Sequence, residues 1–447
     1  MITHRRQIPM TNSLLKLKLE LAGLSGKITL RTTMGGSRIN LWRNANRTGP
    51  VGFDEVWTQA TMPPELYVEG TNSSAASRDV ELVLTYDENP EGEDNPLFMA
   101  SDKINLTVVK VELTNIKFNH DTASSTGDAI NIRQDYTTPI DISNGEWIKG
   151  GANHPVAYTA DNSVTIKARF TVEPNSITSA NIWAVSTDSD GSLGDVIKTN
   201  AKFSGGVSIG DANGYVELPI SGNTPNIVKK SSTDAWQWKA KNINGTSLAC
   251  DFDISGPHTV YTILKEPVTP WINTAGNQRN AWTVVLDYAC TWAVAATDEA
   301  NVVSKITSGA YSSFGKTYDG RQSHTFGSHC ELSDMLSDSV VDCRDMSAVV
   351  QLFTRLTGGA TVQVRRVNGP FNYKPILPIG NSIWAGGDWN FHQFGWHAAA
   401  VNDACAKLKE STPYIPVHDD LNGNYKNNLF NSGRWTPLSP HTITSFD

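Results

Sequence analysis

The sequence predicts a multidomain protein in which two antiparallel β-sandwich domains precede an α+β domain. A chain of 447 residues is too long for one ordinary domain. Up to about residue 265, short runs alternate apolar and polar residues, as half-buried strands do. Beyond that point, apolar residues recur with the period of a helix. We therefore expect an immunoglobulin-like β-sandwich over residues 1–113, a second β-sandwich over 114–265 and the α+β domain over 266–447.

Composition and charge exclude several classes of protein. With 39% hydrophobic and 18% charged residues, the chain can bury real cores and is not compositionally disordered. A net charge of −8 and the absence of a Lys/Arg block argue against nucleic acid or an anionic membrane as the main partner. Five cysteines without a Cys-x-x-Cys pair indicate neither a disulfide framework nor a structural zinc site.

The N-terminus carries no convincing targeting segment. His4-Arg5-Arg6 is similar to the basic start of a signal peptide, but charged and apolar residues alternate in 15–21, which predicts a half-buried strand. The most apolar stretch, 281–296, is interrupted by Asp287 and is too short to span a bilayer. The β modules are typical of extracytoplasmic or secreted proteins, so the sequence leaves the compartment open.

The first predicted module contains three clearly alternating strands, at 27–31, 78–86 and 103–111. Turn residues separate them at intervals typical of a sandwich. The acidic loop 87–94 has the carboxylates of a calcium site but not their spacing. We expect a solvated hairpin tip there, with calcium binding as the alternative.

The second predicted module has strands at 164–170 and 258–264. Trp236 and Trp238 share one face of another strand, which predicts core or interface aromatics, with stacking on a sugar as the alternative. The run 188–191 resembles the opening of a calcium loop but lacks the closing Glu. We therefore predict no metal site in this module.

The third domain begins after residues 265–270, where two prolines predict a stiff, extended linker. Helices should come first and strands afterwards. The expected elements are a helix over 278–296, a second helix capped at 297–299 and running to about residue 308, a short helix near 331–336, a helix that starts at Cys343 and stops at Gly358-Gly359, and a strand over 360–367.

The helix that starts at Cys343 carries the most informative residues. Its apolar positions follow one helical face: Met346, Val349, Val350, Phe353 and Leu356. At a helix N-terminus, unpaired backbone N–H groups and the helix dipole favour a thiolate, so Cys343 is a candidate nucleophile. Asp345 should cap the helix. Asp342 should oppose the thiolate unless it points away or pairs with Arg344.

Three short motifs resemble the transglutaminase-like branch of the papain-type cysteine enzymes. They are Val-Asp-Cys343-Arg-Asp-Met-Ser-Ala with its helix ending in Thr-Arg-Leu-Thr-Gly-Gly, then Phe-His392-Gln-Phe, then Val-Asn-Asp403-Ala-Cys. The resemblance is confined to the last predicted domain. It implies a catalytic triad of Cys343, His392 and Asp403, with a Cys at a helix start and a His and an Asp on neighbouring strands.

This resemblance implies cysteine-dependent acyl transfer from an amide, with a Gln side chain or a peptide bond of a protein as substrate and no metal or organic cofactor. Hydrolysis by water and cross-linking by an amine both remain open. The family commonly adds an upstream donor to the nucleophile's own N–H in the oxyanion hole, and the candidates are Trp292, Gln322 and Tyr318.

The register of the predicted hairpin bears on which histidine is the base. A turn at His397-Ala398 places His392 directly across from Asp403, close enough for the carboxylate to hold the ring. A turn at Gly395-Trp396 removes this pairing. The rival assignment is His397 with Asp419 or Asp420, and a third interpretation makes either His a core residue bonded to backbone.

A second function from another class fits the same sequence. The chain could be a catalytically inactive structural or surface-binding protein that uses all three domains to contact proteins or glycans. The two β modules fit a larger surface assembly as well as they fit an enzyme.

Overall fold

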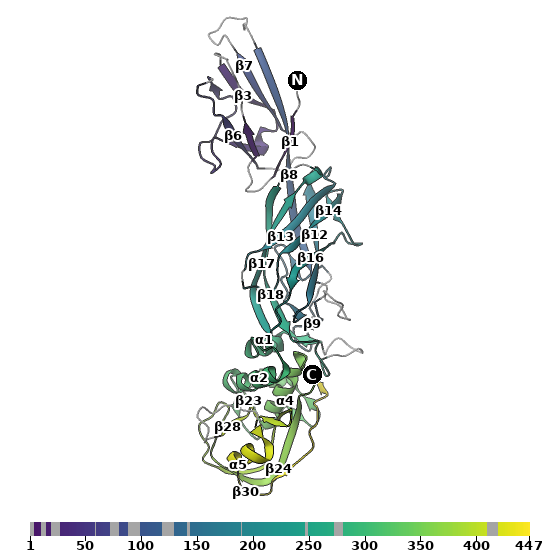
Figure 1. The fold of residues 1–447 in the computed structure, drawn as a ribbon, viewed down its shortest axis with the longest axis vertical. Helices are drawn as coiled ribbons and strands as arrows, with labels where there is room; N and C mark the ends of the chain where they lie inside the picture. The colour runs from purple at the N-terminus through teal and green to yellow at the C-terminus, as the bar shows by residue number, and fades with distance from the viewer. Residues whose placement is uncertain are drawn as a thin grey trace.

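The computed structural model describes residues 4–9, 15–18, 27–58, 60–71, 80–87, 99–118, 129–140, 144–188, 190–245, 249–271, 280–408 and 419–447. Three lobes follow one another along an elongated molecule, with the N-terminus at the side of the uppermost lobe (Figure 1). The chain is mostly β and is organised into several sheets, which confirms the expectation of a β-rich, multidomain protein. The acidic loop predicted over 87–94 lies outside the described residues from position 88 onward.

The first lobe is a two-layer β structure. One layer contains β1 (His4–Pro9), β3 (Lys27–Met34), β5 (Val56–Trp57), β7 (Val80–Asp87) and the first part of β8 (Met99–Lys117). The other contains β2 (Leu15–Lys18), β4 (Ile39–Trp42) and β6 (Glu65–Gly70), and a 3₁₀ turn, Gly36–Arg38, precedes β4. Apolar side chains of both layers form one core. The layer is not purely antiparallel, because β1 runs parallel to β8.

Strand β8 joins the first lobe to the second without a break. Its early residues pair with β7, and its later residues pair with β12 (Ser163–Glu173) and β10 (Trp147–Ile148). Val108 packs in the first core and Val109 in the second. The two lobes therefore share a strand, and position 113 lies inside it.

The second lobe is built from the longest strands of the molecule. Besides β10 and β12, its strands are β11 (Val156–Thr159), β13 (Ser179–Ser186), β14 (Val196–Ser204), β15 (Val207–Ile209), β16 (Val216–Asn223), β17 (Lys229–Lys241) and β18 (Ala249–Ile263), with a short turn at Ile243–Gly245. Pairing is antiparallel except between β11 and β18. One apolar core fills the lobe.

The two tryptophans of β17 belong to that core. Trp236 and Trp238 are only 1% and 0% exposed, and their rings contact each other and Phe170 or Phe118. Their indole N–H groups donate to the carbonyl of Gly194 and to Ser255. Neither ring is available to stack on a sugar, so the core interpretation is correct and the sugar-stacking alternative is wrong.

The third lobe starts with helices, as predicted. Its helices are α1 (Thr283–Trp292), α2 (Glu299–Ser313), α3 (Leu332–Ser337), α4 (Cys343–Leu356) and α5 (Lys426–Leu429), with a π-helical turn, η4 (Leu421–Tyr425). The side chain of Asp298 caps α2. Short pairs surround the helices: β9 (Ile132–Arg133) with β19 (Ala281–Trp282), β20 (Thr317–Tyr318) with β23 (Val340–Val341), and β21 (Thr325–Phe326) with β22 (His329–Cys330) and β32 (Ser445–Phe446).

One hydrophobic core spans the junction between the second and third lobes. Tyr261 and Ile263 of β18 pack with Leu286 of α1 and with residues of α2 and α4. The Tyr261 hydroxyl donates to Asp287 at 2.5 Å, and Lys230 forms an ion pair with the same carboxylate at 2.6 Å. The predicted linker also bonds to α4, because Val268 N donates to the carbonyl of Arg355. These lobes are therefore packed together rather than joined by a free spacer.

A sheet of strands lies against α4 and completes the third lobe. Its members are β24 (Gln363–Tyr373), β26 (Gly387–His397), β27 (Ala400–Asn402), β29 (Asp419–Asp420), β30 (Phe430–Gly433) and β31 (Thr436–Pro437). A separate pair joins β25 (Ile376–Pro378) to β28 (Ala406–Leu408). Gly395 of β26 contacts α4 so closely that an added Cβ would lie 2.5 Å from Val350 Cγ1.

The hairpin between β26 and β27 turns at Ala398-Ala399, so both turn positions considered from the sequence are wrong. His397 pairs with Ala400 and Gly395 with Asn402. The register differs by two residues from the one that places His392 opposite Asp403. Because side chains alternate with a period of two, a shift of two keeps both residues on the same face of the sheet.

Replacing the two alanines of this turn by an Asn-Gly pair should stabilise the protein. Ala398 and Ala399 are exposed and have φ values of 48° and 63°, a left-handed conformation that costs an alanine roughly 1–2 kcal/mol. Ala398→Asn with Ala399→Gly should raise the free energy of unfolding by about 1 kcal/mol. Urea denaturation measures this, and Ala400→Gly in the adjacent strand is the control that should not stabilise.

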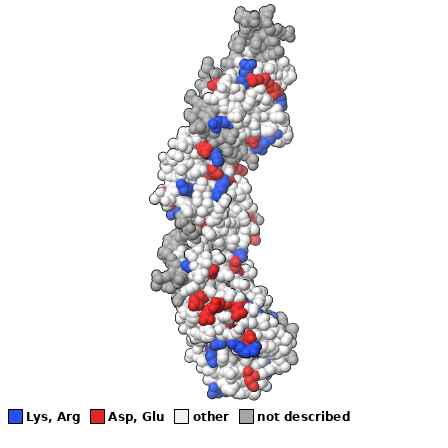
Figure 2. All heavy atoms as spheres, turned by 180° about the vertical axis from the view of Figure 1, so that it is seen from behind, with Lys and Arg blue, Asp and Glu red and all other residues white. Residues whose placement is uncertain are grey.

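The surface charge is unevenly distributed on the third lobe. On the face seen in Figure 2, acidic and basic side chains gather in two adjacent groups at the lower end of the molecule. In the described part of the chain, no helix combines the length and the apolar character needed to cross a bilayer.

Candidate functional site

Cys343 begins α4, and its position follows from the capping residues on either side. The Asp342 carboxylate accepts from the backbone N–H groups of Arg344 and Asp345, and the Asp345 carboxylate accepts from the N–H of Asp342. This capping box confirms the predicted role of Asp345. Asp342 also pairs with Arg344 Nε at 2.8 Å, the arrangement that the sequence left open.

His392, in the middle of β26, and Asp403, just after β27, form a hydrogen-bonded pair. His392 Nε2 lies 2.9 Å from Asp403 Oδ2, and both residues are buried. Strand pairing between β26 and β27 ends at Asn402, so Asp403 reaches the ring diagonally from just beyond the ladder. The structure thus brings the two residues together by a register other than the predicted one.

Three further groups hold this pair, and two of them were not singled out from the sequence. Tyr425 donates its hydroxyl to Asp403 Oδ2 at 2.7 Å, and Cys405 N donates to Asp403 Oδ1 at 2.8 Å. The Trp389 ring stacks on the imidazole, with centroids 4.4 Å apart and planes 12° apart. Trp389 lies two residues before the Phe-His392-Gln-Phe motif, whereas Tyr425 carries no sequence signal and is brought in by η4.

The thiol lies next to β26 but forms no hydrogen bond with the imidazole in the described structure. The backbone N–H of Gln393 donates to the Cys343 sulfur, and the Gln393 side chain donates to Ser347 of α4 at 2.8 Å. His392 and Gln393 are adjacent on β26, so their side chains point to opposite faces of the strand. Within the described residues, His392 Nδ1 has no hydrogen-bond partner, and no hydrogen bond joins it to Cys343. The ring nitrogen that a thiol would need is therefore buried and unused.

The electrostatics around Cys343 differ from the prediction of a thiolate. Burial raises the pKa of the Cys343 thiol well above its ordinary value, and the Asp342 and Asp403 carboxylates raise it further. The hydrogen bond from Gln393 and the charge of Arg344 lower the pKa but do not reverse this. The resting thiol is neutral because only 3% of the residue is exposed. The expected effect of the helix N-terminus is outweighed by desolvation.

His397 lies on the opposite face of β26 from His392, as the odd spacing of the two residues requires. Its Nε2 is 3.9 Å from Glu299 Oε1 of α2. The Asp420 side chain accepts from Asn422 N and so caps η4. The side chain of Asp419 lies outside the described residues.

The three candidate oxyanion donors lie in different places. Trp292 stacks on Phe353 in the helical core. Gln322 lines a pocket of about 640 Å³ beside the first turn of α4. Tyr318 is close enough to Cys343 for an electrostatic interaction: burial is the first cause of the raised pKa of Tyr318, and Cys343 is the second.

The pocket beside α4 contains a histidine that sequence reasoning missed. His324 Nδ1 lies 3.3 Å from Asp345 Oδ2, and its Nε2 lies 3.4 Å from Asp338 Oδ2. Arg344, the residue after Cys343, also lines this pocket. No motif surrounds His324 in the sequence, so its link to the start of α4 depends on tertiary structure alone. Among the described residues, no group of His, Cys, Asp and Glu side chains is arranged to hold a metal ion.

The buried thiols should make the protein less stable in alkali. Burial is the first cause of a raised pKa for all five cysteines, and the pKa values of Cys250 and Cys330 rise to about 12. An unfolded thiol ionises near pH 8.5, whereas the folded thiol stays neutral, so stability is retained below that pH and is lost above it. Each thiol should cost roughly 1.4 kcal/mol per pH unit above pH 8.5.

Urea denaturation at pH 7.5, 8.5 and 9.5 measures this loss. Above pH 8.5 the unfolding free energy of Cys343→Ala should fall less steeply with pH than that of the wild type. The difference is the contribution of one thiol. Equal slopes for the variant and the wild type would show that Cys343 ionises as easily in the folded chain as in the unfolded chain.

No model of a known protein family matches this chain, and no curated protein sequence matches it either.

Proposed function

We propose that this protein is a cysteine-dependent acyl transferase or amidase similar to the transglutaminase-like, papain-type enzymes. Cys343 is the nucleophile, His392 the base and Asp403 the residue that orients the base. The observation that supports this most directly is the His392–Asp403 hydrogen bond of 2.9 Å next to a strand residue, Gln393, that bonds the sulfur of Cys343.

The hydrogen bonds of His392 suit the role of a base. A triad requires an imidazole between a thiol and a carboxylate, with one ring nitrogen for each. Here Nε2 is occupied by Asp403, while Nδ1 has no partner among the described residues. Asp403 accepts a hydrogen from Nε2, which keeps Nδ1 unprotonated and able to take the thiol proton.

The reaction then follows in two steps. His392 Nδ1 takes the proton of Cys343 as the sulfur attacks the amide carbonyl, and the imidazolium gives that proton to the leaving amine or ammonia. Water or a second amine attacks the thioester and releases the thiol. The first step requires the ring and the sulfur to approach each other, because in the resting structure the sulfur accepts a hydrogen bond from the Gln393 N–H. Binding of substrate at the start of α4 would have to bring this about.

The backbone N–H of Cys343 is suited to stabilise the oxyanion. As the first N–H of α4 it has no intrahelical acceptor, and the Asp342 carboxylate accepts from Arg344 and Asp345 instead. The Tyr318 hydroxyl is the preferred second donor, since Tyr318 is an electrostatic neighbour of Cys343. Substrate would enter from the pocket that Arg344 and His324 line.

The burial of Cys343 favours a second candidate function. A thiol that is 3% exposed, neutral and without a hydrogen bond to His392 in the described structure is also what an inactive domain would contain. In that case the three packed lobes serve as a structural or surface-binding rod (Figure 1).

Incubation with a glutamine-containing peptide separates the two functions. The enzyme should release ammonia, and in the presence of a primary amine it should join that amine to the glutamine, both read by mass spectrometry. Cys343→Ala should abolish both products, and Cys250→Ala in the second lobe is the matched control. If the wild type and Cys343→Ala give the same products, the structural function is the correct one.

A further inference from the structure

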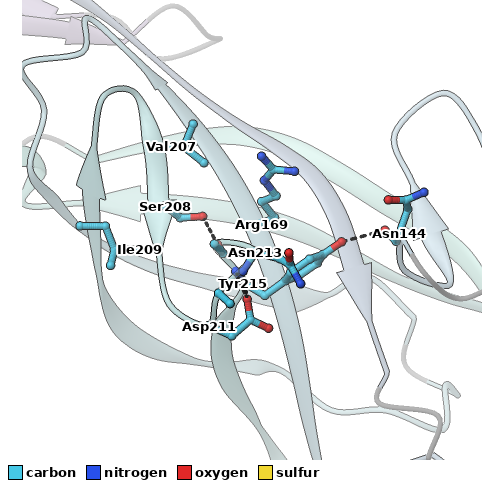
Figure 3. A pocket seen from close by; sticks show the side chains of 10 residues that line it. Asn144, Arg169, Val207, Ser208, Ile209, Asp211, Asn213 and Tyr215 are labelled. Atoms are coloured by element: carbon cyan, nitrogen blue, oxygen red, sulfur yellow. Dashed lines mark hydrogen bonds between the residues drawn. The ribbon is translucent and has the colours of Figure 1, made fainter.

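A pocket of about 540 Å³ opens on the second lobe, far along the chain from Cys343. It lies between β12, the turn that joins β15 to β16, and the segment before β10 (Figure 3). Its lining includes these polar residues: Asn144, Arg169, Ser208, Asp211, Asn213 and Tyr215. Its volume is that of a site for a small molecule.

The pocket is held open by hydrogen bonds within its own wall. The Asp211 carboxylate accepts from the N–H groups of Asn213 and Tyr215, at 2.9 and 3.1 Å. Ser208 donates to the carbonyl of Gly214 at 2.6 Å. The Tyr215 hydroxyl donates to the carbonyl of Asn144 at 2.8 Å, as Figure 3 shows. The turn and the β10 segment are thus fixed to each other before any ligand arrives.

Arg169 is the unexplained residue of this wall. Its Nε is buried without a hydrogen-bond partner and lies against Gly214, where an added Cβ would be 3.9 Å away. Among the described residues, no carboxylate forms an ion pair with this guanidinium. A carboxylate in the pocket would therefore gain an ion pair with the guanidinium that the described protein does not supply.

The charges around Arg169 also favour an anion. Lys117 lies over the Tyr215 ring at 4.6 Å, and Lys117 and Lys167 both act on Asp211. The acidic groups nearby are Asp211, Glu146 and Glu217, the last of which lies opposite Lys167 in the sheet. Arg169 forms no ion pair in the described structure, and one such cation suits a single carboxylate better than a doubly charged phosphate.

The remaining lining describes the rest of the ligand. In the described structure the side-chain amides of Asn144 and Asn213 form no hydrogen bonds. Both residues line the pocket, as does Asp211, whose Oδ1 accepts the hydrogen bonds within the turn. Amides and a carboxylate together match the hydroxyls of a sugar, which donate and accept. Ile209, which is 53% exposed, adds an apolar surface for the C–H groups of a ring.

We propose that this pocket binds an acidic sugar, with its carboxylate on the Arg169 guanidinium and its hydroxyls on Asp211, Asn144 and Asn213. Arg presents a planar fork that pairs with a carboxylate through two N–H groups. The site is independent of the chemistry at Cys343 and would attach the second lobe to an acidic polysaccharide.

Titration calorimetry of the whole chain with glucuronate and galacturonate tests this site. At least one of them should bind saturably, and glucose, which lacks the carboxylate, should bind at least roughly tenfold more weakly. Arg169→Gln should weaken binding by roughly tenfold or more, whereas Lys202→Gln, an exposed cation on β14 that does not line the pocket, should not. Asn213→Ala on the exposed turn should also weaken it and serves as the second variant, with circular dichroism to show that both fold.

Four results would overturn the proposal. These are the absence of saturable binding of either sugar acid, equal binding of glucose, unchanged binding by Arg169→Gln, and displacement by inorganic phosphate at the same concentration as the sugar acid. The last would show a general oxyanion site instead.

Discussion

Asp403→Asn should lower the rate of acyl transfer by roughly a thousandfold, because it inverts the tautomer of His392. Asp403 accepts three hydrogen bonds, from His392 Nε2, Tyr425 and Cys405 N. An Asn that keeps the bond from Cys405 N turns its NH₂ group toward His392. The ring must then accept at Nε2 and carry its proton on Nδ1, where it can no longer take a proton from Cys343.

Tyr425→Phe is the matched control for that change. It removes one donor from Asp403 but leaves the carboxylate and the tautomer of His392 in place. Its rate should stay within about tenfold of the wild type. The measurement is ammonia release from a glutamine peptide over a range of substrate concentrations. A rate for Asp403→Asn equal to that of Tyr425→Phe would mean that Asp403 does not orient the base.

Arg355→Met should destabilise the third lobe by roughly 3 kcal/mol or more. The Arg355 guanidinium sits at the end of α4 and donates to the carbonyls of Val362, Thr269 and Ala360 at 3.0, 2.8 and 2.9 Å. It therefore ties the helix to the strand that follows it and to the linker that precedes the lobe. Met has a similar volume, so the loss measures the hydrogen bonds rather than a cavity.

The control for Arg355 is Arg321→Met. The Arg321 side chain is 89% exposed and pairs with Asp319, so its loss should leave the stability nearly unchanged. Urea denaturation followed by tryptophan fluorescence compares the two variants. Equal midpoints for Arg355→Met and the wild type would show that the linker does not depend on α4.

The helices of the third lobe could be predicted because each carries its own signals. The apolar stripe from Met346 to Leu356 is fully buried on α4. Asp298 caps α2 where the sequence places a cap, and Asp345 takes part in the capping box of α4 as expected, although the N-cap residue itself is Asp342. The β-rich character of the first two lobes followed from alternation in the same way. Each of these signals is local, so the sequence contains it completely.

The hairpin register and the pKa of Cys343 could not be predicted, because both depend on tertiary contacts. Ala398 and Ala399 adopt positive φ although alanine gives no signal for such a turn. The thiolate expected at the start of α4 requires solvent, and packing against β26 removes it. His392 and Asp403 still meet, because a shift of two residues preserves the face of a strand.

The strand that the first and second lobes share could not be predicted for a similar reason. Alternation predicts that a strand exists but not which sheet it joins, and β8 pairs first with β7 and then with β12. Arg169 Nε, which has no hydrogen-bond partner among the described residues, gives no sequence signal, since the same residue on an exposed strand would look identical.

Trapping the acyl-enzyme tests the central claim most directly. The wild-type protein is mixed with a glutamine peptide, quenched in acid within the first turnover, digested and analysed by mass spectrometry. The account predicts a thioester on the Cys343 peptide with the mass of the substrate minus ammonia, present in the wild type and lost in His392→Gln. A Cys343 peptide that stays unmodified under conditions where the substrate is consumed, or an adduct that forms equally without His392, would contradict it.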